Sequence, residues 1–266
     1  MTPSSIQTPN IDQITNQLRT LHMPHARRQI HDILATATSQ RWDPTAILTT
    51  VLETEIQGRA RTSLERRLKQ LGLPATKTFD TFDPTLSTIP AHTLSFLEGL
   101  EWIDRKENLV LAGPAGTGKS HLAAALAQKT VQHGGNAAWL TLPDLERLVA
   151  SHRVDYTIEK TMNKLARNNL IIIDDIGLLP ITQTAAEGFY RICDAAYERT
   201  SLLITTNQHP SHFDKIMPTS LATAAVDRLL HHAHIHLPTP PSLPLPPSLP
   251  TPTTPPQPPP PPPPSP

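Results

Sequence analysis

The first quarter of the chain carries apolar residues at helical spacing. Proline at position 24 ends a first helical run, and a second helix is predicted from there to about residue 38. A third helix is predicted after the capping residue Asp43, continuing to about residue 71, where the sequence GLP stops it. Four apolar side chains mark one face of the first helix: Ile11, Ile14, Leu18 and Leu21. Residues 11–75 therefore predict a small, all-helical domain.

From residue 108 onward, short apolar runs alternate with longer helical patterns. Alternation of strands with helices is typical of an α/β fold, in which helices cover both faces of a parallel sheet. Residues 76–107 are interpreted as a linker and a lead-in helix, with Phe79 and Phe82 as apolar anchors. Five strands are predicted, at residues 108–112, 137–142, 170–175, 201–207 and 234–237. The sequence thus predicts a five-stranded parallel sheet within residues 108–237.

Both ends of the chain differ in composition from this body. Residues 1–10 are predicted to be disordered, and residues 238–266 contain 18 prolines and no charged residue. Such a segment cannot form a packed core and favours extended polyproline II structure. Two interpretations stay open: a docking segment for a proline-recognising domain, or an unselected extension produced by a change of reading frame. We favour the second, because the segment is uniform and begins abruptly after the last predicted strand.

Charge is balanced overall but unevenly distributed. The chain has 23 Lys and Arg against 23 Asp and Glu, yet residues 11–77 hold ten basic and six acidic residues, a net charge of +4. This asymmetry favours double-stranded DNA as a partner of the helical domain, although a solvated basic helix face is the alternative. The basic residues near the end of the third helix are the candidate contacts to DNA phosphates: Arg59, Arg61, Arg66, Arg67 and Lys69.

The sequence contains few features that indicate a cellular compartment. Cys193 is the single cysteine, so the chain cannot form an internal disulfide and an oxidising compartment is not indicated. No apolar run reaches the length needed to cross a bilayer, and the first residues lack the pattern of a signal peptide. We therefore expect a cytoplasmic protein without a membrane partner.

The sequence GPAGTGKS follows the first predicted strand and opens a helix. It fits the pattern G-x-x-x-x-G-K-[ST], in which backbone N–H groups and a lysine surround the phosphates of ATP. Lys119 is predicted to reach the β- and γ-phosphates, and the Ser120 hydroxyl to bind Mg²⁺. The candidate ATP-binding residues are Gly113, Pro114, Ala115, Gly116, Thr117, Gly118, Lys119, Ser120 and His121.

Two carboxylates end the third predicted strand, in the sequence LIIIDDIG. Asp174 is predicted to hold Mg²⁺ directly or through water, and Asp175 to orient or activate the attacking water. Paired aspartates after a strand can also mark an exposed turn. Here they follow a phosphate loop and one intervening strand, so we favour catalytic roles for both.

Two further polar residues are candidates for catalysis. Asn207 ends the fourth predicted strand, where an amide can contact the γ-phosphate or the attacking water. Arg228 lies on a helix before the last strand and can reach the nucleotide of a neighbouring subunit. The alternatives are a simple turn at Asn207 and a local ion pair of Arg228 with Asp227 or another nearby acid.

These motifs together resemble the IstB-like ATP-binding proteins, helper ATPases of bacterial insertion sequences within the AAA+ superfamily and relatives of the DnaC helicase loaders. The resemblance covers residues from about Leu18 to Leu237. It rests on the segments ENLVLAGPAGTGKSHLAAALA, NLIIIDDIG, LLITTN and DRLLHHAHIH, in this order, and on LETEIQGRARTSLERRLKQLGLP before them.

The resemblance implies an AAA+ ATPase that assembles as a homo-oligomer on DNA and recruits or licenses a cognate transposase. It assigns Lys119 and Ser120 to the phosphate loop, Asn207 to the sensor position and Arg228 to the contact between subunits. Two departures imply weak hydrolysis. Asp175 stands where the family usually has glutamate, and the family's terminal G-x-S-[YF]-R segment is replaced by PTPPSLPLPP.

Two other functions stay open at this stage. A DnaC-type loader would have the same ATPase domain, but its N-terminal helices would bind a replicative helicase instead of DNA. A small-molecule kinase would use the same phosphate loop. The kinase interpretation is weaker, because it gives no role to Arg228 or to the basic helices.

Overall fold

A computed structural model describes residues 10–84, 89–152, 157–177 and 181–236 of the chain. The predicted extended proline-rich segment, residues 238–266, lies outside the described residues, and so does the predicted disordered start, residues 1–10, except for Asn10, which caps the first helix.

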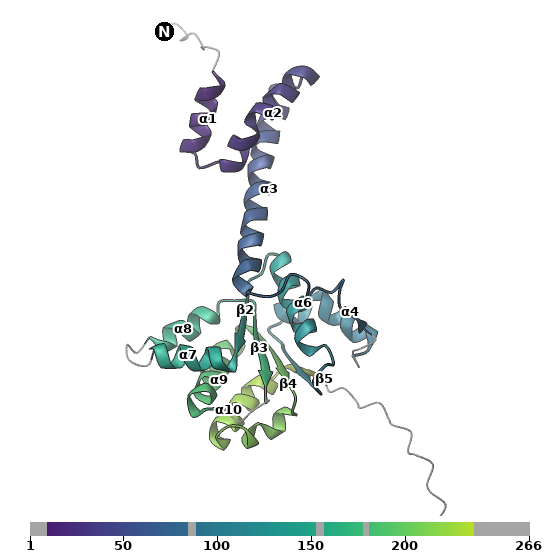
Figure 1. Ribbon diagram of the computed structural model, residues 1–266, viewed down its shortest axis with the longest axis vertical. Coiled ribbons are helices and arrows are strands. Elements are labelled where there is room, and N and C mark those ends of the chain that lie inside the picture. The colour runs from purple at the N-terminus through teal and green to yellow at the C-terminus, as the bar shows by residue number, and fades with distance from the viewer. Residues whose placement is uncertain (1–9, 85–88, 153–156, 178–180, 237–266) are drawn as a thin grey trace, which may run out of the picture.

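The N-terminal region is helical, as predicted. It consists of α1 (Ile11–Thr20), α2 (Pro24–Gln40) and α3 (Pro44–Leu71). Asp43 caps α3, where its Oδ1 accepts hydrogen bonds from the backbone N–H groups of Thr45 and Ala46. The helices enclose a small apolar cluster of Leu18, Ala26 and Ile30. Figure 1 shows α3 extending away from the sheet, with α1 and α2 at its far end.

The remainder forms the predicted parallel sheet, with strand order β2-β3-β4-β1-β5. All four neighbouring pairs are parallel, so the fold class is α/β as the sequence predicted. Because β1 and β3 are separated by β4, their carboxyl ends lie near one another across a single strand. The strands are β1 (Asn108–Ala112), β2 (Ala137–Thr141), β3 (Leu170–Ile176), β4 (Ser201–Thr206) and β5 (Ala233–His236).

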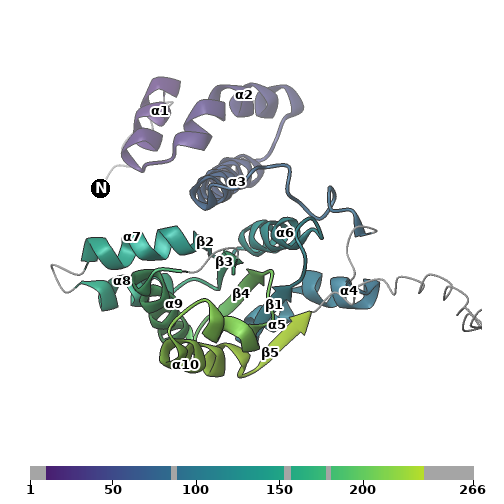
Figure 2. The same ribbon diagram turned by 60° about the horizontal axis from the view of Figure 1, so that its bottom comes forward.

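Alternate residues of the strands face two separate apolar clusters. The cluster on one face of the sheet contains Leu109, Leu170 and Leu203. The helices that pack on this face are α4 (Ala91–Gly99), α5 (Glu101–Asp104) and α6 (Lys119–Gln132). The opposite cluster takes Val110 and Ile171. Its helices are α7 (Leu142–His152), α8 (Ile158–Leu165), α9 (Gln183–Ala196) and α10 (Thr219–Leu230). Figure 2 shows α6 and α3 on one side of the sheet, and α9 and α10 on the other.

The end of α3 packs against this sheet domain. Leu64, Leu68 and Leu71 join the cluster that surrounds α6, and the predicted anchors Phe79 and Phe82 join it as well. A short 3-10 helix, Pro210–Lys215, completes the opposite side beside α10. Within the described residues, no helix is both long and apolar enough to span a membrane.

Candidate functional site

The glycine-rich segment forms a loop between β1 and the first turn of α6. Gly116 and Gly118 adopt φ angles of 83° and 79°, in the left-handed region that favours glycine. α6 begins at Lys119, and no side chain caps its first turn. The first backbone N–H groups of a helix have no intrahelical partners and carry the positive end of the helix dipole. This arrangement suits an anion such as a phosphate group.

Lys119 extends back over the loop. Its Nζ donates hydrogen bonds to the carbonyl oxygens of Gly113 and Pro114, each at 2.7 Å. Partial burial lowers the pKa of Lys119, while the nearby charges of Asp175 and Asp174 oppose that effect. The Lys119 ammonium group therefore lies at the loop with neutral carbonyl groups as its hydrogen-bond partners, which phosphate oxygens can replace.

Asp174 connects the carboxyl ends of β3 and β4 to the amino end of α6. Its Oδ1 accepts hydrogen bonds from the Ser120 hydroxyl at 2.8 Å and from the Thr205 hydroxyl at 2.5 Å. Thr205 belongs to β4, and its role was not evident from the sequence. Oxygen atoms of a serine and a carboxylate are ligands that Mg²⁺ prefers. The donor set at Ser120 and Asp174 thus fits this ion.

Asp175 lies beside Asp174 but in a different backbone conformation. Its φ angle is 66°, and the pairing of β3 with β4 is irregular between Ile173 and Ile176. The Asp175 N–H donates to Thr205 Oγ1 at 2.8 Å, which holds the bulge in place. Partial burial and then the charge of Asp174 raise the pKa of Asp175, and Lys119 opposes this. The exposed Asp175 carboxylate is therefore a stronger base than an ordinary aspartate.

A cavity of about 390 Å³ brings most of the predicted residues together. Asn207 follows β4, and its N–H donates to the Ile176 carbonyl at 3.4 Å. The cavity is lined by Ala115, Gly116, Gly118, Lys119, Ser120, His121, Asp175 and Asn207. A larger cavity of about 600 Å³ lies between the 3-10 helix and α10. None of the predicted loop or carboxylate residues lines it, so the smaller cavity is the candidate site.

The linker after α3 passes over the loop. A carbonyl of the linker, Thr78 O, lies 3.1 Å from His121 Nε2, and the Phe82 and His121 rings meet edge-on at 5.5 Å. Gly118 is close to Phe82 as well, since a Cβ at this glycine would lie 3.1 Å from Phe82 Cε2. Sequence reasoning treated Phe82 as an anchor and missed its position beside the phosphate loop. No motif in the linker signals this contact.

Arg228 does not line the candidate cavity of its own chain. On α10, its Nε donates to Asp194 Oδ1 at 2.8 Å, and its guanidinium lies over the Tyr190 ring at 5.4 Å from the ring centroid. The ion pair thus forms with Asp194 of α9. The sequence left a local ion pair with Asp227 or another nearby acid as the alternative, and Asp194 is that acid. A role of Arg228 toward a neighbouring subunit stays a prediction.

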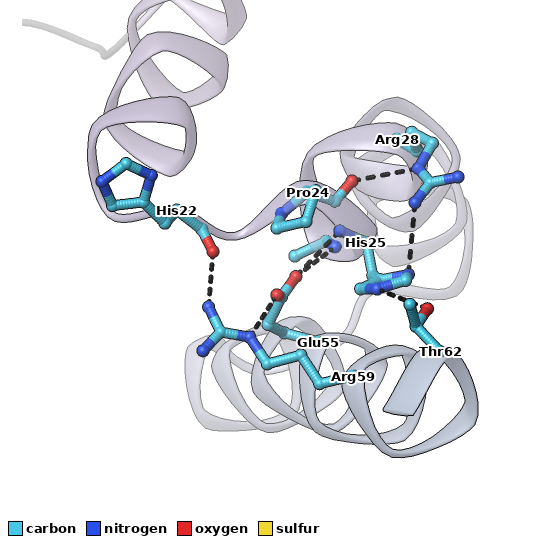
Figure 3. Close-up of polar contacts among 8 residues, drawn as sticks. His22, Pro24, His25, Arg28, Glu55, Arg59 and Thr62 are labelled. Carbon is cyan, nitrogen blue, oxygen red and sulfur yellow. Dashed lines mark hydrogen bonds and ion pairs between the residues drawn. The ribbon is translucent and has the colours of Figure 1, made fainter. Parts of the chain in front are cut away.

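Three of the five basic candidates for DNA contact have partners within the chain. Arg59 pairs with the buried Glu55 at 2.6 Å and donates to the His22 carbonyl, as Figure 3 shows. Arg67 donates to the carbonyl oxygens of Gly134 and Gly135 at 2.7 and 2.9 Å. Arg61 forms a surface ion pair with Glu65. Arg66 and Lys69 are exposed, as are Arg59 and Arg61, whereas Arg67 is half-buried.

Several known proteins are similar to this chain in sequence or in fold. A sequence model described as IstB-like ATP binding protein matches residues 16–239. An insertion sequence IS21 ATP-binding protein of Pseudomonas aeruginosa is 33% identical over 218 residues, which cover 81% of this chain and 82% of that protein. An IS21-like ATP-binding protein of Bacteroides fragilis is 32% identical and covers 84% of this chain and 86% of its own. The crystal structure of DnaI superposes with a TM-score of 0.50 at 16% identity, over 66% of this chain and 98% of that one.

Proposed function

Since the chain belongs to the family of IstB-like ATP binding proteins, we propose that it is an ATPase that assembles on DNA and recruits a transposase. The observation that carries the proposal is the hydrogen bond from Ser120 to Asp174. It joins the end of the phosphate loop to the acidic end of β3, which is the arrangement that ATP hydrolysis by a phosphate-loop enzyme requires.

The residues in and beside the cavity have different roles in the proposed hydrolysis of ATP. Lys119 exchanges its carbonyl partners for the β- and γ-phosphate oxygens of ATP. Ser120 and Asp174 would hold Mg²⁺, which when bound neutralises charge on the phosphates. Asp175 orients the attacking water and accepts its proton, and Asn207 donates its side-chain amide to the γ-phosphate or to that water. Asp175 is one methylene shorter than glutamate, so we expect slow turnover.

DNA is the proposed partner of the helical region. Arg61, Arg66 and Lys69 are exposed on one segment of α3, and contacts to phosphates need no particular base sequence. Each contact is weak, so affinity grows when several subunits bind one DNA molecule. The relatives in Pseudomonas aeruginosa and Bacteroides fragilis are named for the insertion sequences that encode them, which favours a transposase as the protein partner.

ATP is proposed to lie between subunits. Arg228 of one subunit would reach the γ-phosphate held by Lys119 of the next, where a cation stabilises the transition state. The present contact of Arg228 with Asp194 is partly exposed, with 30% of the arginine side chain open to solvent. Such an ion pair is weak and can be exchanged for a phosphate.

An electrophoretic mobility shift series in increasing salt tests the DNA assignment. We expect binding to require a non-hydrolysable ATP analogue, to be independent of DNA sequence and to weaken steeply with salt. The triple variant Arg61→Ala, Arg66→Ala, Lys69→Ala should reduce both the affinity and the salt slope, without changing ATP affinity.

A matched control removes three exposed cations from the sheet domain: Lys160→Ala, Lys164→Ala, Arg167→Ala. This control has the same net charge as the first variant and should bind DNA like the wild type. Equal DNA affinity of the wild type and the α3 variant would contradict the DNA surface. That outcome would favour a helicase loader, whose N-terminal helices bind protein.

A further inference from the structure

Helix α6 connects the phosphate loop to the base of α3. Its first residue is Lys119, and its last turn closes with N–H groups of Gly134 and Gly135 donating to the carbonyls of Val131 and Thr130. The carbonyl oxygens of the same two glycines accept hydrogen bonds from Arg67 Nη1. A cation at the carboxyl end of a helix is stabilised by the helix dipole. The two ends of α6 therefore contact the candidate nucleotide site and the N-terminal helices, respectively.

Arg67 fixes the direction in which α3 leaves the sheet domain. Among the described residues, both hydrogen bonds from α3 to the sheet domain are made by this side chain. The other contacts there are apolar, and apolar packing is non-directional, so it allows small tilts. The Gly135 backbone is closely packed, since a Cβ there would lie 3.0 Å from the Thr130 carbonyl oxygen. The carbonyl groups that hold Arg67 must therefore move together with α6.

The linker then follows α6 back to the phosphate loop. Gln128 Nε2 donates to the carbonyls of Pro74 and Lys77, at 3.2 and 2.9 Å. About two turns nearer the loop, His121 contacts Thr78, and Phe82 lies against Gly118. Residues 67–82 thus contact α6 from its last turn to its first. If the first turn of α6 shifts when a triphosphate binds, residues 67–82 should be displaced with it.

Hydrogen bonds and apolar contacts join the far part of α3 to α1 and α2, and we call these residues the arm (residues 10–63). The buried Glu55 of α3 accepts hydrogen bonds from the backbone N–H groups of His25 and Ala26, at the start of α2 (Figure 3). Arg59 completes this contact through Glu55 and the His22 carbonyl. Residues 44–63 of α3 span about 30 Å, so a tilt of about 10° at the base moves the tip by about 5 Å.

We propose that α6 couples the nucleotide at the phosphate loop to the direction of the arm, and that Arg67 is the positioning residue of this coupling. The proposal rests on the proposed function, because it supplies the reason why DNA binding by α3 depends on ATP. Nucleotide binding rearranges Lys119 and Ser120 at the start of α6, and Arg67 transmits the resulting displacement to α3.

Distances between spin labels measure the coupling in the full chain without DNA. Labels at Thr49→Cys on α3 and Lys160→Cys on α8 both occupy exposed positions, whereas the native Cys193 is buried and stays unlabelled. We expect the distance distribution to shift by several ångströms when a non-hydrolysable ATP analogue binds. Arg67→Met keeps the apolar stem but has no donor, so it should bind the analogue with unchanged affinity and lose the shift.

Two further variants separate coupling from simple stability. Arg66→Met removes one cation from the neighbouring exposed position, and its distance distribution should shift on analogue binding as in the wild type. Arg67→Lys retains a donor and should restore part of the shift. An Arg67→Met protein that binds the analogue and shifts like the wild type would overturn the proposal. So would a wild type that binds the analogue without any shift, whereas failure to bind the analogue would instead contradict the proposed function.

The same variants give a second readout on DNA. In the wild type, we expect the analogue to strengthen DNA binding at least tenfold. In Arg67→Met, the affinities with and without the analogue should become equal, whereas Lys164→Met, at an exposed position of α8 outside the DNA surface, should keep the tenfold difference. If the analogue still strengthens DNA binding tenfold in Arg67→Met, the role of Arg67 as the positioning residue would be contradicted.

Discussion

The Ser120 hydroxyl lies 2.8 Å from Asp174 Oδ1, although the two residues are 54 positions apart in the sequence. One ends the phosphate loop and the other ends β3, so this contact depends on the strand order of the sheet. Thr205 of β4, the strand between β3 and β1, donates to the same oxygen. The carboxyl ends of β3 and β4 and the amino end of α6 therefore meet at a single carboxylate.

Lys119 is predicted to dominate ATP affinity. Lys119→Met removes the cation at the centre of the loop while keeping a similar stem, and ATP should bind at least roughly 100-fold more weakly, because charge-assisted hydrogen bonds to phosphate are lost. Titration with a fluorescent ATP analogue measures this. Lys160→Met, at an exposed site on α8, should bind ATP as the wild type does. Tight ATP binding by the Lys119 variant would contradict the assignment of this loop as the ATP-binding site.

Asp175 is predicted to govern turnover without governing binding. Asp175→Asn should retain ATP affinity and lower phosphate release by about 10²- to 10⁴-fold, the range expected for loss of a general base. Asp175→Glu lengthens the side chain and should raise turnover above that of the wild type. Wild-type turnover by the Asn variant would show that another group activates water.

The pH dependence of hydrolysis follows from the raised pKa of Asp175, which burial and the charge of Asp174 cause. A base must be ionised to accept a proton, so activity should fall as pH decreases through this pKa. The midpoint should lie above 3.8, the ordinary value for aspartate. Steady-state rates across an acidic pH series, normalised to the folded fraction, locate this midpoint. A midpoint at or below the ordinary value would contradict the assigned role.

Much of this fold could be predicted from sequence, because its signals are local. Apolar runs placed the five strands within one or two residues, and the helix predicted after the glycine-rich motif, residues 120–132, begins within one residue of the observed start of α6 at Lys119. The contacts of Arg59 and Arg67 could not be predicted in this way. Both arginines look like members of one exposed basic set, and their partners are a buried glutamate and two backbone carbonyls that tertiary packing brings near. Asp194 beside Arg228 is a long-range partner of the same kind.

Glu55 should make the stability of the chain sensitive to acid. Burial alone would raise the pKa of Glu55, but hydrogen bonds from Arg59, Ala26 and His25 outweigh it and lower the pKa below the ordinary value of 4.5. The stabilisation is therefore complete above pH 4.5 and is lost as the pH falls through the lower pKa of the folded state.

Glu55→Gln removes this titration and weakens the hydrogen bonds to α2. We expect a loss of roughly 1–3 kcal/mol in unfolding free energy at neutral pH, which shrinks as the pH decreases. Thermal denaturation followed by circular dichroism across pH values tests this. A difference between variant and wild type that stays constant with pH would contradict the assigned charge.

Gly58 is predicted to be required by a close approach of two helices. A Cβ at this position would lie 2.2 Å from Cγ of His25, so Gly58→Ala must displace the imidazole ring. Alanine ordinarily stabilises a helix by about 1 kcal/mol relative to glycine, and here the clash should reverse the sign. Gly99→Ala is the matched control, because nothing lies within 4 Å of a Cβ at that glycine. Melting temperatures should fall for Gly58→Ala and stay unchanged or rise for Gly99→Ala.

The central claim is that ATP lies between subunits, held by Lys119 of one and reached by Arg228 of the next. Mixing two inactive variants, Lys119→Ala and Arg228→Ala, tests this most directly, because the mixture forms interfaces in which both residues are intact. Phosphate release is measured on DNA for each variant and for the mixture at equal total concentration. We predict that the mixture hydrolyses ATP severalfold faster than the sum of the separate variants. A mixture no faster than that sum, from variants that still associate, would contradict the shared site.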